Sequence, residues 1–285
     1  RYDNVPYGTA FERLLHLAYE PEYPYHWPTI GSMEDLGAAS LDDIRDFFDT
    51  WYRPDNCVLT IVGDFVPAEA KELASQYFAD VAPAGRFPPF TPTRRPRGVE
   101  RREVFPSQVQ LPRIYRLYHL PKMGEQHWIH ADLLSTVLTS DKASRLERAL
   151  VYDKQIATDV AAYVLPTEAT GMLLLQATAK EGVPIADVER VTDEEIARLI
   201  STGITEDELT RAKNRAEVDV AHQLENYDAR ADLIGMLSTF FGDPTLVDRW
   251  LDPYRAATTA QVTNCARKYL VPENRVTIHF VPEAA

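Results

Sequence analysis

The chain has 285 residues, of which 45% are hydrophobic and 26% charged, and its formal net charge is −13. This composition is ordinary for a globular protein with a buried core, and the length suggests about two domains. The acidic balance argues against nucleic acid as a partner, because phosphate binding needs an excess of Lys and Arg. No run of about 18 apolar residues occurs, so we predict no membrane span. The two cysteines, Cys57 and Cys265, are interpreted as buried free thiols rather than a redox site.

The first third of the chain predicts three helices and one strand. A helix is expected from Pro6 to Tyr19, and a connection rich in proline and aromatic residues follows at 21–36. The pattern continues with a helix at 40–52, a β-branched strand at 57–63 and a helix at 67–79. Residues 82–98 combine Pro, Gly and several Arg, which indicates a solvated linker rather than a basic binding patch.

The remainder of the chain predicts an α+β unit. Strands are expected near 99–105 and at 113–120, and strands at 157–165 and 171–179 form a hairpin. Helices are expected at 126–139, continuing after a break into 144–151, then at 185–201 and from Thr205, where Thr205 and Glu208 form a capping box. This order predicts an antiparallel sheet with helices on one face, a two-layer α+β architecture.

Two stretches of the sequence repeat each other at an offset of 218 residues. YRPDNCVLTIVGD starts at Tyr52 and LVPENRVTIHFVP at Leu270, and the offset aligns Pro54 with Pro272 and Asn56 with Asn274. An amphipathic helix precedes each stretch. The same offset lays the helix at 10–20 over a second helical stretch, RADLIGMLSTFFG. We therefore predict an internal repeat in which residues 1–67 match residues 219–285.

The repeat predicts tandem two-layer domains, the first of them incomplete. Residues 99–218 form the front of the second copy, so the front of the first copy is expected before Arg1. On this basis residues 1–93 are the C-terminal part of a first domain plus a linker, and residues 94–285 are a second domain. An apolar face left uncovered in the first domain makes a homo-oligomer a further expectation.

Candidate catalytic residues are few. His127 and His130 are one helical turn apart with Asp132 near them, which approaches zinc-ligand spacing, but the Glu of a zinc-peptidase helix motif is missing. We interpret them as surface and half-buried helix residues. His16 and His26 have no second His in register, and His279, on a core strand, is interpreted as structural. No phosphate-binding loop or serine-nucleophile motif occurs. The sequence thus assigns no catalytic, cofactor-binding or metal-ligating residue to this chain.

Several motifs resemble the insulinase/pitrilysin family of zinc metallopeptidases. They are RYDNVPYG (1–8), YPYHWPTIGSMEDL (23–36), FFDTWYRPDNCVLTIVGDF (47–65), LYHLP (117–121) and LLSTVLTSDKASRLERAL (133–150). The resemblance implies tandem copies of one α+β domain that close around a peptide or protein substrate. The family's zinc ligands and general-base Glu precede the segment matched by residues 2–8, so none maps onto this chain. Zinc is expected in the parent protein and not here.

The resemblance also bears on the second domain. Many active members place an Arg and a Tyr after the Ser-Arg-Leu run to hold the substrate, and these places hold Val151 and Thr158 here. We expect a fragment of a zinc metalloendopeptidase that is inactive alone and supplies the rest of domain one and a noncatalytic second domain. The alternative, which Val151 and Thr158 favour, is part of a noncatalytic partner subunit that binds peptide or a sister subunit. An unrelated α+β binding module would require the repeat to be absent from the structure.

Overall fold

The structure is a computed structural model that describes residues 5–83, 85, 87 and 100–283. The chain divides into two compact units: unit 1 comprises Arg1–Pro28, Pro92–Glu217 and Leu251–Ala285, and unit 2 comprises Thr29–Thr91 and Val218–Trp250. The expected linker at 82–98 lies almost entirely outside the described residues. None of the helices in the described ranges has the length and apolar content needed to cross a bilayer.

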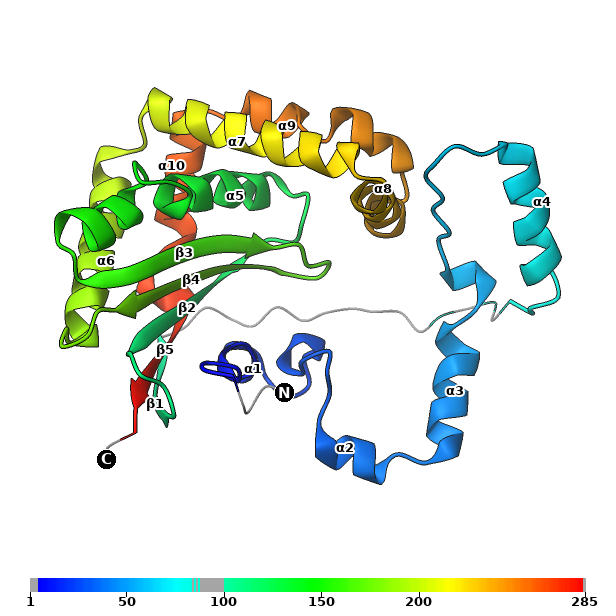
Figure 1. The fold of residues 1–285 in the computed structure, drawn as a ribbon, viewed down its shortest axis with the longest axis horizontal. Helices are drawn as coiled ribbons and strands as arrows, with labels where there is room; N and C mark the ends of the chain where they lie inside the picture. Colours follow the sequence, from blue (N-terminus) through cyan, green and yellow to red (C-terminus); the bar gives the residue numbers. More distant parts are fainter. Residues whose placement is uncertain (1–4, 84, 86, 88–99, 284–285) are drawn as a thin grey trace. The chain divides into compact units, whose positions relative to one another are not determined.

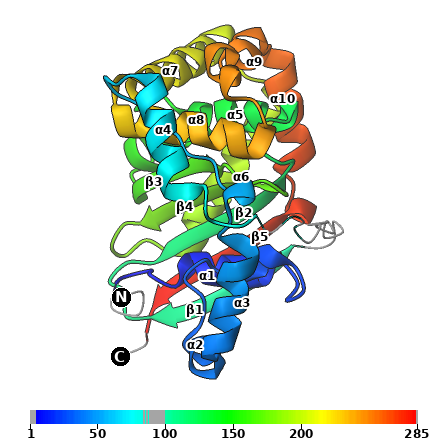
Figure 2. The ribbon, with the colours of Figure 1, turned by 90° about the vertical axis from the view of Figure 1, so that its right-hand side faces the viewer.

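A five-stranded sheet forms the centre of unit 1 in the described part of the chain. Its strands are β1 (Arg101–Ser107), β2 (Arg113–Leu120), β3 (Ala157–Leu165), β4 (Gly171–Ala179) and β5 (Arg275–Pro282). They lie in the order β1-β5-β2-β4-β3 (Figure 2). Only the β1–β5 pair is parallel, and the other three are antiparallel. The predicted α+β class is therefore confirmed, with one parallel pair that the sequence did not predict.

Helices cover both faces of this sheet. Helices α5 (Gln126–Thr139), α6 (Ile185–Thr202) and α10 (Thr259–Tyr269) lie on one face and α1 (Ala10–Ala18) on the other (Figure 1). Alternation along β2 explains this: Tyr115 and Leu117 join the core cluster under α1, whereas Arg116 reaches Glu189 of α6. The sequence predicted helices on one face of the sheet, where α5, α6 and α10 lie. It did not predict that α1 covers the other face.

The remaining helices of unit 1 follow α6 in the chain or differ from their predicted bounds. Thr205 and Glu208 form the predicted capping box at the start of α7 (Glu206–Glu225), and the last turns of α7 belong to unit 2. A short helix, α9 (Asp252–Ala256), precedes α10. The predicted α-helical continuation at 144–151 is instead a π-helical segment at Glu147–Asp153. Helix α1 is shorter than predicted, because residues 5–8 form a turn in which Gly8 N–H donates to Val5 O.

Four α-helices lie wholly within unit 2 in the described part of the chain. They are α2 (Met33–Ala38), α3 (Leu41–Trp51), α4 (Pro67–Phe78) and α8 (Tyr227–Phe241). Asn226 caps the start of α8, and Gly242 ends it with a positive φ of 69°. The strand predicted at 57–63 is wrong: no described strand pairs with this extended segment. A strand needs a neighbour for its backbone hydrogen bonds, which local sequence does not supply. For the same reason Cys57 is exposed, not buried.

The internal repeat appears in the structure as one series of elements that occurs twice. Helix α1, turn η1 (Pro24–His26), α2, α3 and turn η2 (Pro54–Asn56) recur in the same order as α8, turn η4 (Pro244–Arg249), α9, α10 and turn η5 (Pro272–Asn274). Both ends of α3 and α10 differ by 218 residues, as do both ends of η2 and η5. Each helix also begins with a capping box, at Ser40 and at Thr258.

The two copies exchange one helix. In unit 1, α1 of the first copy packs on β5 of the second, where Leu14 and Leu15 join Ile278 and Phe280 in one core cluster. In unit 2, α8 of the second copy lies on segment 57–63 of the first, and a Cβ built at Gly235 would be 3.2 Å from Thr60 Oγ1. Each compact unit therefore combines a helix of one copy with the helix and extended segment of the other.

Candidate functional site

His127 and His130 lie together on α5 but do not converge on a common point. Their ring centroids are 5.9 Å apart with the planes at 80°, and the ring of His127 also meets Tyr269 edge-on. His130 is buried rather than half-buried, at 3% exposure. Burial, with a smaller effect of His127, lowers the pKa of His130 to about 4. At neutral pH it is an uncharged core side chain.

The nearby carboxylate serves another partner. Asp132 Oδ2 accepts a hydrogen bond from the Tyr254 hydroxyl at 2.9 Å, and burial followed by this carboxylate raises the pKa of Tyr254. Among the described residues no group of three or more His, Cys, Asp or Glu is placed to hold a metal ion. The residues on α5 therefore do not fit a zinc site, which needs at least three converging protein ligands.

The other predicted histidines make structural contacts. The rings of His16 on α1 and His26 in η1 stack with centroids 4.5 Å apart, and His26 Nδ1 lies 2.8 Å from Tyr19 O. His279 on β5 has Nε2 3.0 Å from Glu189 Oε2. The second cysteine, Cys265, is buried as predicted, and its thiol donates to His127 O at 3.3 Å.

Val151 and Thr158 occupy the two places at which the family resemblance implies substrate-holding residues. Val151 lies in the π-helical segment, and Thr158 is an exposed residue of β3 whose hydroxyl donates to Asp159 Oδ2 at 2.9 Å. Neither side chain carries a positive charge or a phenol. At these two positions the chain therefore lacks a group that would polarise or clamp a peptide carbonyl.

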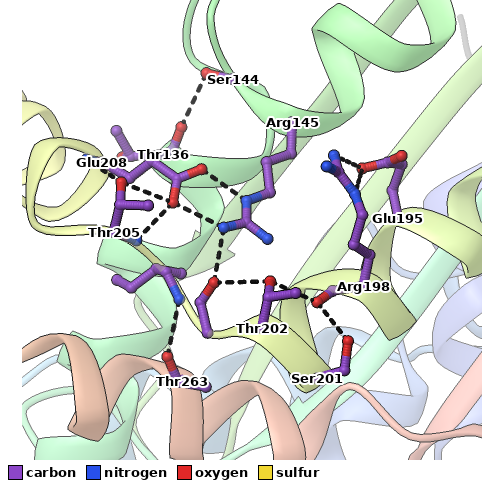
Figure 3. Close-up of polar contacts among 12 residues, drawn as sticks. Thr136, Ser144, Arg145, Glu195, Arg198, Ser201, Thr202, Thr205, Glu208 and Thr263 are labelled. Atoms are coloured by element: carbon purple, nitrogen blue, oxygen red, sulfur yellow. Dashed lines mark hydrogen bonds and ion pairs between the residues drawn. The ribbon is translucent and has the colours of Figure 1, made fainter.

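A buried clamp centred on Arg145 lies just before the π-helical segment (Figure 3). Arg145 donates from Nε and Nη2 to the two carboxylate oxygens of Glu208, at 2.7 and 2.8 Å, and from Nη2 to Gly203 O at 2.8 Å. Glu208 also accepts from Thr205 N at 2.8 Å. Burial would raise the pKa of Glu208, but the bonds from Arg145 and Thr205 lower it. Ile204 N donates to Thr263 Oγ1, so the clamp joins the α6–α7 turn to α10.

A second buried group of charges lies between the sheet and α6. Arg116, fully buried on β2, pairs with Glu189 at 3.1 Å and with Asp193 at 2.8 Å. Arg275 on β5 pairs with Asp193 and Glu100, both within 2.8 Å. Sequence reasoning missed this network because it reads helix acids as solvated. The signal was Arg116 at the centre of an apolar strand, together with two acids one turn apart on α6.

Unit 2 presents an apolar face instead of a polar site. The apolar stripe of α3 is exposed, and so are apolar residues of the extended segment after it. These residues are Ile44, Phe47, Phe48, Trp51, Val58, Leu59 and Ile61, which are between 37% and 59% exposed. Exposed apolar surfaces of this kind are typical of interaction sites rather than of scattered surface residues.

Sequence comparison identifies the type of domain. The model of the family described as "Peptidase M16 inactive domain" matches residues 38–216, more than half of the chain. The zinc protease PqqE of Helicobacter pylori is 26% identical over 243 residues, 84% of this chain and 54% of the relative. YmxG of Bacillus subtilis, an uncharacterized zinc protease, is 21% identical and covers 94% of this chain and 64% of the relative. The chain thus spans little more than half the length of these relatives.

Solved structures show the same fold. A protease from Helicobacter pylori aligns over 99% of this chain and 68% of its own, with a TM-score of 0.89 at 24% identity. A peptidase M16 inactive domain from Pseudomonas fluorescens aligns over 99% of this chain and 66% of its own, with a TM-score of 0.80 at 20% identity. Together with the family model, these likenesses lead to one conclusion. The chain belongs to the peptidase M16 family, the insulinase/pitrilysin family that its sequence resembles.

Proposed function

We propose that this chain is the noncatalytic part of a zinc-dependent metalloendopeptidase of the insulinase/pitrilysin type. Residues 1–93 would be the C-terminal part of the first domain plus the linker, and residues 94–285 a noncatalytic second domain of the substrate chamber. The observation that carries the proposal is the contrast between the two copies of the repeat. The second copy belongs to the five-stranded sheet of unit 1, and its described residues hold no metal-ligand group. The first copy presents an apolar face on α3 and the segment after it.

The role of the chain's own residues would be packing and enclosure of a peptide or protein substrate. In such an enzyme zinc supplies an activated water. Neither the His127 and His130 pair nor any other described group fits that ion, so no chemical step is assigned to residues of this chain. The names of the relatives PqqE and YmxG support zinc chemistry in the complete protein.

The proposal is tested by comparing this chain with the longer protein encoded when about 120 upstream codons are included, the size of the expected half-domain. We expect the longer protein to cleave a quenched fluorescent peptide, to lose activity with a zinc chelator and to contain one zinc. The chain alone should show neither activity nor bound zinc. About one zinc per purified chain at neutral pH would contradict the assignment.

One observation favours a second candidate function. Val151 and Thr158 stand where substrate-holding residues are expected, which suits part of a noncatalytic partner subunit that binds peptide or a sister subunit. The upstream sequence separates the two candidates. A His-x-x-Glu-His helix with a later Glu would support the peptidase, and the same fold pattern without these ligands would support the partner subunit.

A further inference from the structure

We propose that Arg113 and Tyr115, on the sheet face that α1 covers only in part, bind the carboxylate of a peptide. The inference rests on the proposed function in one respect, because it takes the occupant to be a peptide. It goes beyond that function by naming the chemical group that is recognised and the side chains that recognise it.

The guanidinium of Arg113 is held in a fixed plane at the start of β2. Its Nε donates to Thr178 Oγ1 at 2.7 Å, and its Nη1 donates to the Tyr115 hydroxyl at 3.1 Å. The ring of Tyr7 lies against it, with the ring centroid 3.9 Å from Arg113 Cζ. An arginine fork that is already oriented loses little conformational freedom when it binds an anion.

Tyr7 is held against Arg113 in a strained backbone conformation. Its φ of 61° lies in the left-handed region, which bulky residues rarely adopt. Two contacts keep it there: the Tyr7 hydroxyl donates to Leu111 O at 2.6 Å, and the ring meets Phe280 edge-on with centroids 6.0 Å apart. Strained residues are concentrated at ligand clamps and other functional sites, so this conformation supports a binding role for the guanidinium that Tyr7 covers.

The Nη2 atom of Arg113 makes no hydrogen bond to a described residue. The acid that faces it is Asp159, whose Oδ2 is 3.9 Å away, beyond hydrogen-bonding distance. Asp159 Oδ2 instead accepts from the Thr158 hydroxyl at 2.9 Å. The side chain of Arg113 is 21% exposed and that of Asp159 is 47% exposed, so solvent reaches this pair. The hydrogens of Nη2 therefore suit a carboxylate, the planar anion that the arginine fork matches.

The hydroxyl of Tyr115 supplies a second donor. It accepts the hydrogen bond from Arg113 Nη1, so its own proton is left for another acceptor. Burial raises the pKa of Tyr115 more than the nearby Arg113 lowers it, so the hydroxyl keeps this proton at neutral pH. A carboxylate placed between this hydroxyl and Nη2 would receive a charge-assisted hydrogen bond from each.

The positions beside this pair suit a peptide. The strand register places Gln176 of β4 next to Tyr115 and Ala161 of β3 beyond it, and both are half-buried. The amide of Gln176 can donate to and accept from a main chain, and Tyr163, two residues farther along β3, is 45% exposed. An extended peptide whose carboxylate is at Arg113 would therefore cross a polar position and then an aromatic one. The net charge of −13 disfavours a polyanion, whereas a single carboxylate needs only this one cation.

Isothermal titration calorimetry of the chain with three matched peptides tests the inference. The probes are the blocked pentapeptide acetyl-Ala-Ala-Leu-Ala-Ala as its free acid, the same peptide as its C-terminal amide, and that amide with Glu in place of the last Ala. We expect the free acid to bind about tenfold more tightly than the amide, because the amide cannot accept charge-assisted hydrogen bonds as a carboxylate does. The Glu probe identifies the source of the carboxylate: tight binding supports a site for any peptide carboxylate, and weak binding supports a site for the peptide C-terminus.

Three variants assign the preference to this pair. Arg113→Lys keeps the charge but removes the fork, so the free acid should lose most of its advantage over the amide. Asp159→Asn removes a competing carboxylate and should strengthen binding of the free acid by about threefold. Because Asp159 is exposed, this variant also serves where loss of the fork disturbs folding. Arg190→Lys, in a surface pair on α6, is the control and should leave the preference unchanged.

Three results would overturn the inference: no measurable binding of the free acid, equal binding of free acid and amide, or a preference that survives in Arg113→Lys. The experiment uses neither zinc nor cleavage, so it is separate from the test of the proposed function. A carboxylate preference in a chain whose longer form does not cleave peptides would refute only the peptidase. Zinc-dependent cleavage by the longer protein, without a carboxylate preference in the chain, would refute only the carboxylate site.

Discussion

The clamp between Arg145 and Glu208 gives the sharpest stability prediction. Both side chains are at least 87% buried, and two hydrogen bonds join them in a bidentate pair. Removing one partner of such a pair leaves an uncompensated buried charge, which costs about 3–5 kcal/mol. Arg145→Ala also removes the donor to Gly203 O at the α6–α7 turn. We therefore expect Arg145→Ala to lower the free energy of unfolding of unit 1 by about 4 kcal/mol.

Urea unfolding followed by tryptophan fluorescence measures this change. Trp128 on α5 is 5% exposed and donates from Nε1 to Leu165 O, so it reports on the unit 1 sheet, whereas Trp27 is half exposed. With a urea slope of about 2 kcal/mol per molar, the midpoint should fall by about 2 M. Arg190→Ala is the matched control, because the Arg190–Glu194 pair is also 2.7 Å long but lies on the surface, and it should leave the midpoint nearly unchanged.

A double-mutant cycle separates the clamp from simple loss of packing. Gln at position 208 keeps an acceptor for the Thr205 N–H, so Glu208→Gln chiefly removes the charge that Arg145 needs. Combined with Arg145→Met it should cost less than the sum of the single changes by at least about 1 kcal/mol. A midpoint for Arg145→Ala equal to that of Arg190→Ala, or fully additive changes, would show that the clamp is energetically a surface pair.

Three further predictions concern the same unit. Because His130 has a folded pKa of about 4 against about 6.5 unfolded, the unfolded state binds more protons between these values. Stability should therefore fall by about 3 kcal/mol as pH drops from 6.5 to 4, and His130→Leu should flatten this part of the urea-midpoint profile. An unchanged slope would contradict the neutral buried state. Glu189→Gln should destabilise the protein at pH 7, since burial raises the pKa of Glu189 but bonds from His279 and Arg102 lower it further. Its stabilising effect is present above the unfolded pKa and lost as pH falls through the folded one, so variant and wild type should converge in acid. Gly171→Ala should cost about 3 kcal/mol, because the new Cβ would lie 2.1 Å from Pro121 O. Gly37→Ala, with open space around it, should be tolerated, and equal thermal midpoints for the two variants would refute the clash.

The sequence predicted elements well where their signals are local. Strands β2, β3 and β4 and helix α5 have the predicted bounds, because turn residues and apolar periodicity mark their ends. The predicted capping box of Thr205 and Glu208 likewise depends on residues three apart. The strand at 57–63 failed because its hydrogen bonds must come from a distant partner, and the burial of Cys57 failed with it.

The candidate site shows the same division between local and distant information. The sequence separated the α5 histidines from a complete zinc motif, since ligand spacing on a helix is a local property. It could not place Arg145 beside Glu208, because 63 residues separate them. Nor could it show that α1 packs on β5 and α8 on segment 57–63. A constant offset shows that two segments are alike, and it does not say which copy each segment contacts.

The two copies of the repeat differ on the face of the strand that α6 covers in unit 1. Both copies keep the helix caps and the Pro-acid-Asn turn. Under the exchanged helix, Val276 and Phe280 correspond to the apolar residues Val58 and Val62, whereas Ile278 corresponds to Thr60. They differ on the α6 side of the strand, where Arg275 and His279 of β5 replace the uncharged Cys57 and Ile61. A buried charged strand face accepts only a helix with matching acids, and an apolar face rejects that helix. The acids of α6 would therefore lack charged partners if such a helix lay on segment 57–63.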